Sequence, residues 1–176
     1  MEEKTAVDSN ILISALLKGK VYPLIKKLRR QGIKFISTKA NQKEVLKYLP
    51  FIAEKLKLEI DFIKLTFSLL PVEYLEPSKK FLEKSKGIIR DPDDVPLLAI
   101  ALEHKIPVWT NDKDFENTGI EFITTEEMLK SPLEYLGYRF VNAFILHFRT
   151  INNLDFAILQ LPLSNKYCLI MGIYPT

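Results

Sequence analysis

Short apolar runs that alternate with longer amphipathic stretches constrain the fold of this chain more than any other feature of its sequence. Apolar residues at helical spacing fill the stretches between the runs. Strands that alternate with helices form parallel sheets covered on both faces. We therefore expect an α/β fold, a three-layer α/β/α sandwich around a short central parallel sheet. The five runs that we expect to be strands are Thr5–Val7, Lys34–Ser37, Val72–Leu75, Ile106–Thr110 and Ile120–Ile123.

Several residues predict where the helices begin and end. Pro50 lies inside the third helical stretch and predicts a kink or a division there. Gly32 is placed to end the second helix and Thr38 to begin the third. Thr124 and Glu127 have the spacing of a capping box, which predicts a last short helix. The other helices that we expect are Ile11–Leu17, Val21–Gln31, Lys39–Ala53, Leu56–Leu70, Lys79–Lys86 and Val95–His104.

The alternating pattern covers residues 1–130, which we expect to form one domain, because 176 residues are too few for two full cores. Residues 131–176 depart from it, with many aromatic and aliphatic residues and few charges. This apolar C-terminal extension has three interpretations that the sequence leaves open: a packed extension, an oligomerisation surface or a poorly ordered tail.

The composition favours a soluble, cytoplasmic protein. Cys168 is the only cysteine, so no internal disulfide forms, and no Cys/His cluster has the spacing of a zinc site. The acidic N-terminus is unlike a secretory signal, and no apolar stretch is long enough to span a membrane. A formal net charge of +3 agrees with a polyanionic partner, but many unrelated enzymes share it.

Acidic residues stand at positions that a parallel sheet would bring to one edge. Asp8 directly follows the first strand, and Asp112 and Asp114 directly follow the fourth. Asp94 begins the helix that leads to the fourth strand, and Glu44 lies early in the helix after the second. Ligands of open α/β sheets bind beyond the carboxyl ends of the strands. We therefore expect these carboxylates to converge on one site.

Converging carboxylates favour one kind of chemistry. They repel one another, and their pKa values rise unless a cation compensates. Oxygen ligands without cysteine or clustered histidine favour Mg²⁺ or Mn²⁺ over Zn²⁺. Such an ion orients and deprotonates a water molecule and stabilises charge on an attacked phosphorus. The reaction that fits is hydrolysis of a phosphodiester.

The segments that carry these acids resemble the PIN domain family over about residues 4–130. The resemblance rests on Val7-Asp8-Ser9-Asn10, an acidic residue in the third helix, the run from Asp94 to Ala101, and Thr110-Asn111-Asp112-Lys113-Asp114-Phe115. It implies a compact α/β/α fold, Mg²⁺ or Mn²⁺, and cleavage of single-stranded or structured RNA. Many small members are the toxin half of VapC-type toxin–antitoxin pairs, which implies an antitoxin partner and a homodimer.

The resemblance also implies the roles of individual residues. The catalytic metal ligands are Asp8, Glu44, Asp94 and Asp112, supported by Asp114; Asn10, Thr110, Asn111 and Asp91 are expected to hydrogen-bond these ligands. Two departures from the family pattern stand out. The chain continues beyond residue 131, where small members of the toxin type usually end. The run Asp91-Pro92-Asp93-Asp94 leaves the identity of the third ligand open.

Each of these features also has a plainer interpretation. Asp8 is a good helix N-cap, Asp91 a turn residue, and Glu44 a solvated helix residue. The basic stretch within residues 18–30 is either a phosphate-binding surface or a solvated helix face. Trp109 is expected in the core.

Two alternative functions follow from these interpretations. A catalytically idle PIN-like module would bind RNA or protein. A haloacid-dehalogenase-type phosphatase also begins with an aspartate after its first strand, but it needs a second acid where Asn10 stands.

Overall fold

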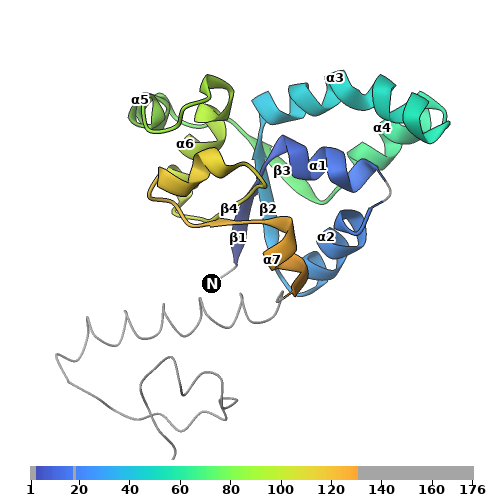
Figure 1. Ribbon diagram of the computed structural model, residues 1–176, viewed down its shortest axis with the longest axis horizontal. Coiled ribbons are helices and arrows are strands. Elements are labelled where there is room, and N and C mark those ends of the chain that lie inside the picture. The colour runs from blue at the N-terminus through green and yellow to red at the C-terminus, as the bar shows by residue number, and fades with distance from the viewer. Residues whose placement is uncertain (1–2, 18, 131–176) are drawn as a thin grey trace, which may run out of the picture. The chain divides into compact units, whose positions relative to one another are not determined.

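The computed structural model describes residues 3–17 and 19–130 (Figure 1). They contain a parallel sheet of five strands, as the alternating sequence pattern predicted, and the strand order is β3-β2-β1-β4-β5. The strands are β1 (Lys4–Val7), β2 (Lys34–Thr38), β3 (Val72–Leu75), β4 (Val108–Trp109) and β5 (Phe122–Ile123). The predicted C-terminal extension, residues 131–176, lies outside the described residues.

Helices cover both faces of the sheet. Figure 1 shows α1 to α4 on one side of the strands and α5 and α6 on the other, so the predicted α/β/α layers are confirmed. The helices are α1 (Ser9–Leu16), α2 (Val21–Arg30), α3 (Lys39–Leu56), α4 (Ile60–Ser68), α5 (Lys79–Ser85), α6 (Val95–His104) and α7 (Thr125–Lys130), with short 3-10 turns η1 (Pro92–Asp94) and η2 (Lys113–Asn117). Among the described helices, none has the length and apolar character needed to cross a bilayer.

The predicted boundary between the third and fourth helices is wrong. Helix α3 continues through Pro50 to Leu56, and α4 begins at Ile60 instead of Leu56. Pro50 lies on the exposed side of α3, where water can satisfy the carbonyl that the proline leaves without a partner. Lys57 ends α3 in the left-handed conformation, with a φ of 53°. The chain therefore turns between the two helices at the residues that were expected to start the second.

The predicted capping residues behave as expected. Thr38 accepts the Asn41 backbone N–H at 2.9 Å and so caps α3. Thr124 and Glu127 form a reciprocal capping box before α7, because each side chain accepts the other's backbone N–H. Gly32, just after α2, has a φ of 97°, a backbone conformation that residues with a Cβ rarely adopt.

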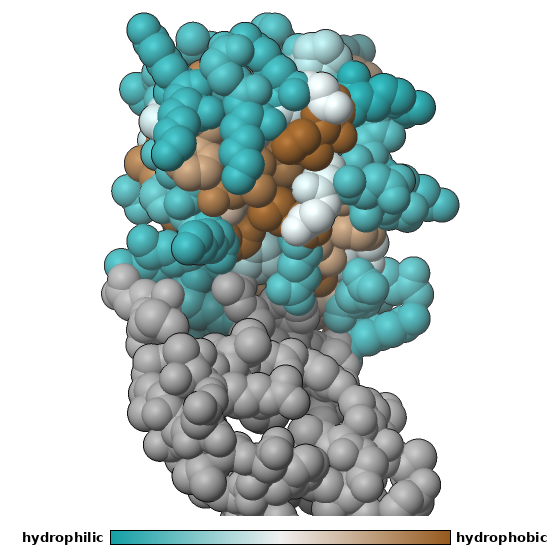
Figure 2. All heavy atoms as spheres, turned by 90° about the vertical axis from the view of Figure 1, so that its left-hand side faces the viewer, coloured by the Kyte–Doolittle hydropathy of each residue, from teal (hydrophilic) through white to brown (hydrophobic). Residues whose placement is uncertain are grey.

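A hydrophobic core lies on each side of the sheet. Trp109 is fully buried with its ring centroid 6.0 Å from that of Phe35, which confirms its place in the core. Helix α6 is apolar almost all round, because it packs between the sheet and the elements outside it. Figure 2 shows the side of the molecule that carries α5 and α6, where an apolar band lies between hydrophilic atoms. Partly buried residues packed against this core are Leu75, Leu82, Leu102, Ile120 and Phe122.

The path of the chain places β1 at the centre of the sheet. From β1 the chain moves outward through β2 to β3, then returns by α5 and α6 to β4 on the other side of β1. Strand order therefore reverses between β1 and β4. A crevice beyond the carboxyl ends of two such strands is where open α/β sheets bind their ligands.

Candidate active site

Asp8 lies where β1 and β4 end side by side. Val7 pairs with Trp109 in the sheet register, so the next residues, Asp8 and Thr110, are neighbours. The backbone N–H of Asp8 donates to the Trp109 carbonyl at 3.1 Å, which fixes the main chain at this point. The Asp8 side chain is only 3% exposed. The first predicted ligand is thus a buried carboxylate at the switch point of the sheet.

Side-chain donors from three segments surround the Asp8 carboxylate. Oδ2 accepts the Thr110 hydroxyl at 2.6 Å and the Asn10 amide at 2.6 Å. Oδ1 accepts the Ser9 hydroxyl at 3.2 Å and the Asn41 amide at 3.3 Å. The predicted support of Asp8 by Asn10 and Thr110 is therefore present in the structure. Asp8 does occupy the N-cap position of α1, as its plainer interpretation predicted, but its side chain makes no capping bond there.

Burial raises the pKa of Asp8 above its usual value. The hydrogen bonds from Thr110 and Ser9 oppose this rise, because they favour the charged form. The charge of Glu44 raises the pKa further, which places the half-buried Glu44 of α3 within electrostatic reach of Asp8. Asp8 is thus a carboxylate whose ionised form depends on the donors around it.

The charges of four other carboxylates act on Asp94. It ends η1 and directly precedes α6, and its side chain is partly buried. Burial raises its pKa to about 7, with further contributions from the negative charges of Asp8, Asp112, Asp91 and Asp114. Carboxylates from β1, from η1 and from the loop after β4 therefore act on one another. The strand-end positions predicted that these acids lie near one another; that they form one metal site stays a prediction.

The loop after β4 is tied to Asp8 through Thr110. The Thr110 hydroxyl, which donates to Asp8, accepts the Asp112 backbone N–H at 3.0 Å. Asp112 Oδ1 in turn accepts the Asp114 backbone N–H at 2.8 Å. Both carboxylate oxygens of Asp114 contact Arg90, each at 3.0 Å. That Asp114 is a metal ligand stays a prediction, and in this structure its oxygens are engaged by a guanidinium.

Asp91 and Asn111 have local roles. Asp91 Oδ1 accepts the Asp93 backbone N–H at 2.9 Å and so caps η1, as its interpretation as a turn residue predicted. Asp91 also raises the pKa of Asp94 by its charge. The Asn111 side-chain oxygen accepts the Thr125 backbone N–H at 2.8 Å. Asn111 therefore fixes the start of α7, whereas a contact with the acids was expected.

Three partners of the acids were missed from the sequence: Ser9, Asn41 and Arg90. Asn41 is 5% exposed, and its side-chain oxygen accepts the Thr38 hydroxyl while its amide reaches Asp8. One signal for it was available. Asn41 lies three residues before Glu44, a spacing that puts both on one face of α3. Nothing in the sequence pattern pointed to Arg90.

The residues of this site fit a hard divalent cation. The donors are carboxylate and amide oxygens, which Mg²⁺ and Mn²⁺ prefer. Asn10 adds a buried side-chain oxygen, Oδ1, that has no hydrogen-bond partner among the described residues. Within residues 3–17 and 19–130 no three acidic, histidine or cysteine side chains already stand in a ligating arrangement. Mg²⁺ needs no such cage, because it commonly takes one or two carboxylates and keeps several waters.

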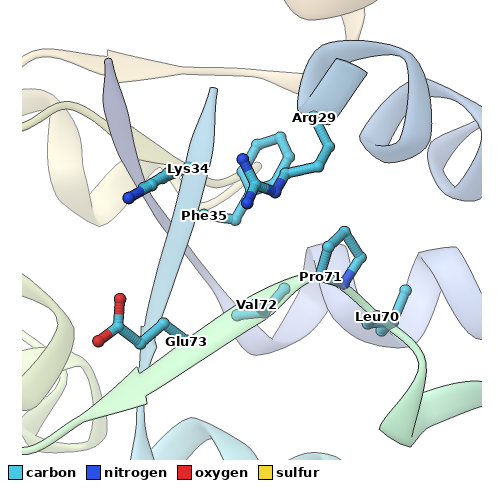
Figure 3. Close-up of a pocket in the computed structure, with 7 residues that line it drawn as sticks. All are labelled: Arg29, Lys34, Phe35, Leu70, Pro71, Val72 and Glu73. Atoms are coloured by element: carbon cyan, nitrogen blue, oxygen red, sulfur yellow. The ribbon is translucent and has the colours of Figure 1, made fainter. Parts of the chain in front are cut away.

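A hollow of about 350 Å³ lies away from the acids. Figure 3 shows Arg29, Phe35 and Val72 among the residues that line it, together with Lys34 and Glu73. Lys34 and Val72 are the first residues of β2 and β3, so this hollow lies at the amino ends of the strands.

The acids of the candidate site lie at the opposite, carboxyl ends of the strands. We use the name acidic rim for four of them: Asp8, Glu44, Asp94 and Asp112.

Comparisons with known proteins agree with this fold. A family model described as PIN domain matches residues 6–131. Among solved structures, the chain is similar to one in the crystal structure of VapBC2 from Rickettsia felis bound to a DNA fragment from their promoter. That match has a TM-score of 0.54 at 16% identity and covers 69% of this chain and 98% of the other, so it shows a shared fold. No curated protein sequence matches.

Proposed function

The chain belongs to the PIN domain family, and from this premise we propose that it is a metal-dependent endoribonuclease. We propose that the acidic rim binds Mg²⁺ or Mn²⁺ and hydrolyses phosphodiester bonds of RNA. The observation that carries the proposal is the placement of Asp8, Asp94 and Asp112 at the carboxyl edge of β1 and β4, where burial and the neighbouring carboxylates raise the pKa of Asp94 to about 7. Neighbouring carboxylates repel one another and so destabilise the metal-free protein. A bound divalent cation compensates their charge and removes this repulsion.

The residues of the acidic rim that would bind the metal differ in their exposure to solvent. Asp8 is buried and fixed by hydrogen bonds, whereas Asp94 is partly buried and Asp112 is exposed. A phosphodiester that approaches from solvent therefore meets Asp94 and Asp112 before Asp8. When bound, the cation would supply an activated water and stabilise charge on the phosphoryl oxygens.

The protein groups have separate tasks in this proposal. The Thr110 hydroxyl and Asn10 amide keep Asp8 oriented and favour its ionised form. Asp94, with its pKa of about 7, holds a proton at its carboxylate for part of the time at neutral pH when no cation is present. Asn10 donates its amide to Asp8, so it does not provide the second acid that haloacid-dehalogenase chemistry requires.

The identity of the substrate and partners rests on the family. RNA is the substrate that the resemblance implies, single-stranded or structured. An antitoxin partner is supported by the shared fold with a chain of the VapBC2 complex. A homodimer rests on the resemblance and on the apolar composition of residues 131–176, and a monomeric mass in solution would remove it.

Cleavage of a mixed panel of single-stranded and structured RNAs tests the proposal. Wild-type protein should cut with Mg²⁺ or Mn²⁺ and stop with EDTA. Asp94→Asn should be inactive, because it removes a charge from the acidic rim. Asp93→Asn is the matched control, since Asp93 is the exposed neighbour of Asp94 and should leave cleavage unchanged. If folded wild-type protein binds metal but cuts none of the RNAs, the idle RNA- or protein-binding module becomes the better interpretation.

A further inference from the structure

Arg90 forms the most directional ion pair near the acidic rim. Its Nε donates to Asp114 Oδ2 at 3.0 Å, and its Nη2 lies 3.0 Å from Asp114 Oδ1. Two parallel contacts of this kind fix the angle as well as the distance between the two groups. The two residues are 24 positions apart, so the pair joins the segment before η1 to the loop after β4.

Each partner of this ion pair continues into the acidic rim. The Asp114 N–H donates to Asp112 Oδ1, and the Asp112 N–H donates to the Thr110 hydroxyl, which donates to Asp8. On the other side, Arg90 directly precedes Asp91, which caps the 3-10 turn that ends at Asp94. Movement of Arg90 would therefore displace both the segment that carries Asp94 and the loop that carries Asp112.

We propose that Arg90 is a positioning residue, which clamps the Asp94 segment to the Asp112 loop through Asp114 and so sets the spacing of the acidic rim. The inference rests on the proposed function, because the acids that it positions are those proposed to bind the metal. In this division of roles, Asp114 is the counter-ion of the clamp. Asp112 remains available to the cation.

Exposure argues that the clamp acts on geometry more than on stability. The side chain of Arg90 is 87% exposed and that of Asp114 is 16% exposed. An ion pair in which one partner is this open to solvent usually contributes little to the free energy of unfolding. Substitution of Arg90 should therefore leave the protein folded while it loosens the two loops.

Charge alone predicts the opposite effect on metal binding. A guanidinium close to a cation site repels the cation, so its removal would tighten binding if electrostatics dominated. Removal of a group that orients ligands weakens metal binding, typically by 10–100-fold. The sign of the change therefore separates positioning from simple charge repulsion.

The test is Mn²⁺ affinity by titration calorimetry without RNA, for the full chain and its variants. Arg90→Gln is expected to weaken Mn²⁺ binding about 10-fold. Asp114→Asn should do the same, and the double variant should be no worse than either single one. Arg90→Lys keeps the charge but loses the forked contact, so it should not restore binding. Lys86→Gln is the matched control and should change nothing, because the Lys86 side chain is exposed and forms its ion pair with the exposed Glu83, outside the acidic rim.

Amide hydrogen exchange of the metal-free proteins tests the clamp independently of the proposed function. Arg90→Gln should speed exchange at the Asp112 and Asp114 amides, and Lys86→Gln should not. Unchanged exchange at both amides would overturn the inference, as would unchanged or tighter Mn²⁺ binding. A change confined to RNA affinity and its salt dependence would also overturn it, and would make Arg90 a phosphate contact. If wild-type protein binds no Mn²⁺, the proposed function fails, and faster exchange still supports the clamp.

Discussion

Replacement of Asp94 by asparagine should stabilise the metal-free protein while it abolishes stabilisation by metal. Asparagine has nearly the shape of aspartate but carries no charge. At pH 8 it removes a carboxylate that is partly buried and repelled by Asp8 and Asp112. No side-chain hydrogen bond of Asp94 is lost from the cap of α6, because it makes none there.

The raised pKa gives the size of the effect. The pKa of Asp94 is about 7 in the folded protein, against an ordinary value of 3.8. At 1.36 kcal/mol per pKa unit, the full difference corresponds to about 4 kcal/mol. Asp94 is only partly buried, so solvent screening reduces this to about 2 kcal/mol. For a domain of this size, the melting temperature should rise by roughly 5–10 °C at pH 8.

The pH dependence has a definite sign. A carboxyl whose pKa is raised by folding binds more protons in the folded state, so stability falls as pH rises. The loss begins near pH 4 and is complete above about pH 7, the two pKa values of Asp94. Wild-type protein should therefore gain stability from pH 8 to pH 5 by more than the Asp94→Asn variant does.

Urea denaturation at pH 5 and pH 8, with EDTA or with Mn²⁺, measures each part of this prediction. Mn²⁺ should stabilise wild-type protein in proportion to the logarithm of its concentration and leave the variant nearly unchanged. Asp93→Asn controls for the loss of any surface charge. Equal stability of Asp94→Asn and wild-type protein at pH 8 in EDTA would refute the idea that the acids repel one another.

Two further substitutions test the support of the site and the core beneath it. Thr110→Val leaves the buried Asp8 oxygen and the Asp112 N–H without their shared partner, so it should cost about 1–3 kcal/mol in urea denaturation. Thr110→Ser keeps the hydroxyl and should cost much less; an equal loss in both would assign the effect to packing. Leu98→Ala empties a fully buried position in α6 and should lower the free energy of unfolding by about 2–5 kcal/mol. A loss below about 1 kcal/mol would mean that this face of the sheet is loosely packed.

The fold could be predicted because the spacing of apolar residues identifies the strands and helices, and their alternation along the chain predicts the same layered arrangement. Short buried strands between helices have few arrangements other than a covered parallel sheet. The boundary between α3 and α4 could not be predicted, because Leu56 and Leu58 continue the apolar periodicity into the turn. The turn depends on Lys57 in a left-handed conformation, which is uncommon for residues other than glycine and which no sequence signal marks here.

The positions of the acids at one edge of the sheet could be predicted for a similar reason, whereas most of their hydrogen-bond and ion-pair partners could not. Asp8, Asp94 and Asp112 stand at strand or helix ends, and parallel strands bring such ends to one edge. The contacts between Asn41 and Asp8 and between Arg90 and Asp114 join residues 33 and 24 positions apart. Pairs of this kind depend on how helices and loops pack, which no local pattern encodes.

The pairing of β1 with β4 also sets when the site can exist during synthesis. The Asp8–Thr110 hydrogen bond joins residues 102 positions apart, and a ribosome releases the earlier one first. A nascent chain that has not yet exposed β4 lacks Thr110, one of the donors that orient Asp8, and it lacks Asp112. For most of its translation, a growing polypeptide therefore lacks the complete set of carboxylates that form the acidic rim. For a nuclease, this order of assembly would keep cleavage away from the messenger that encodes it until the described domain is nearly complete.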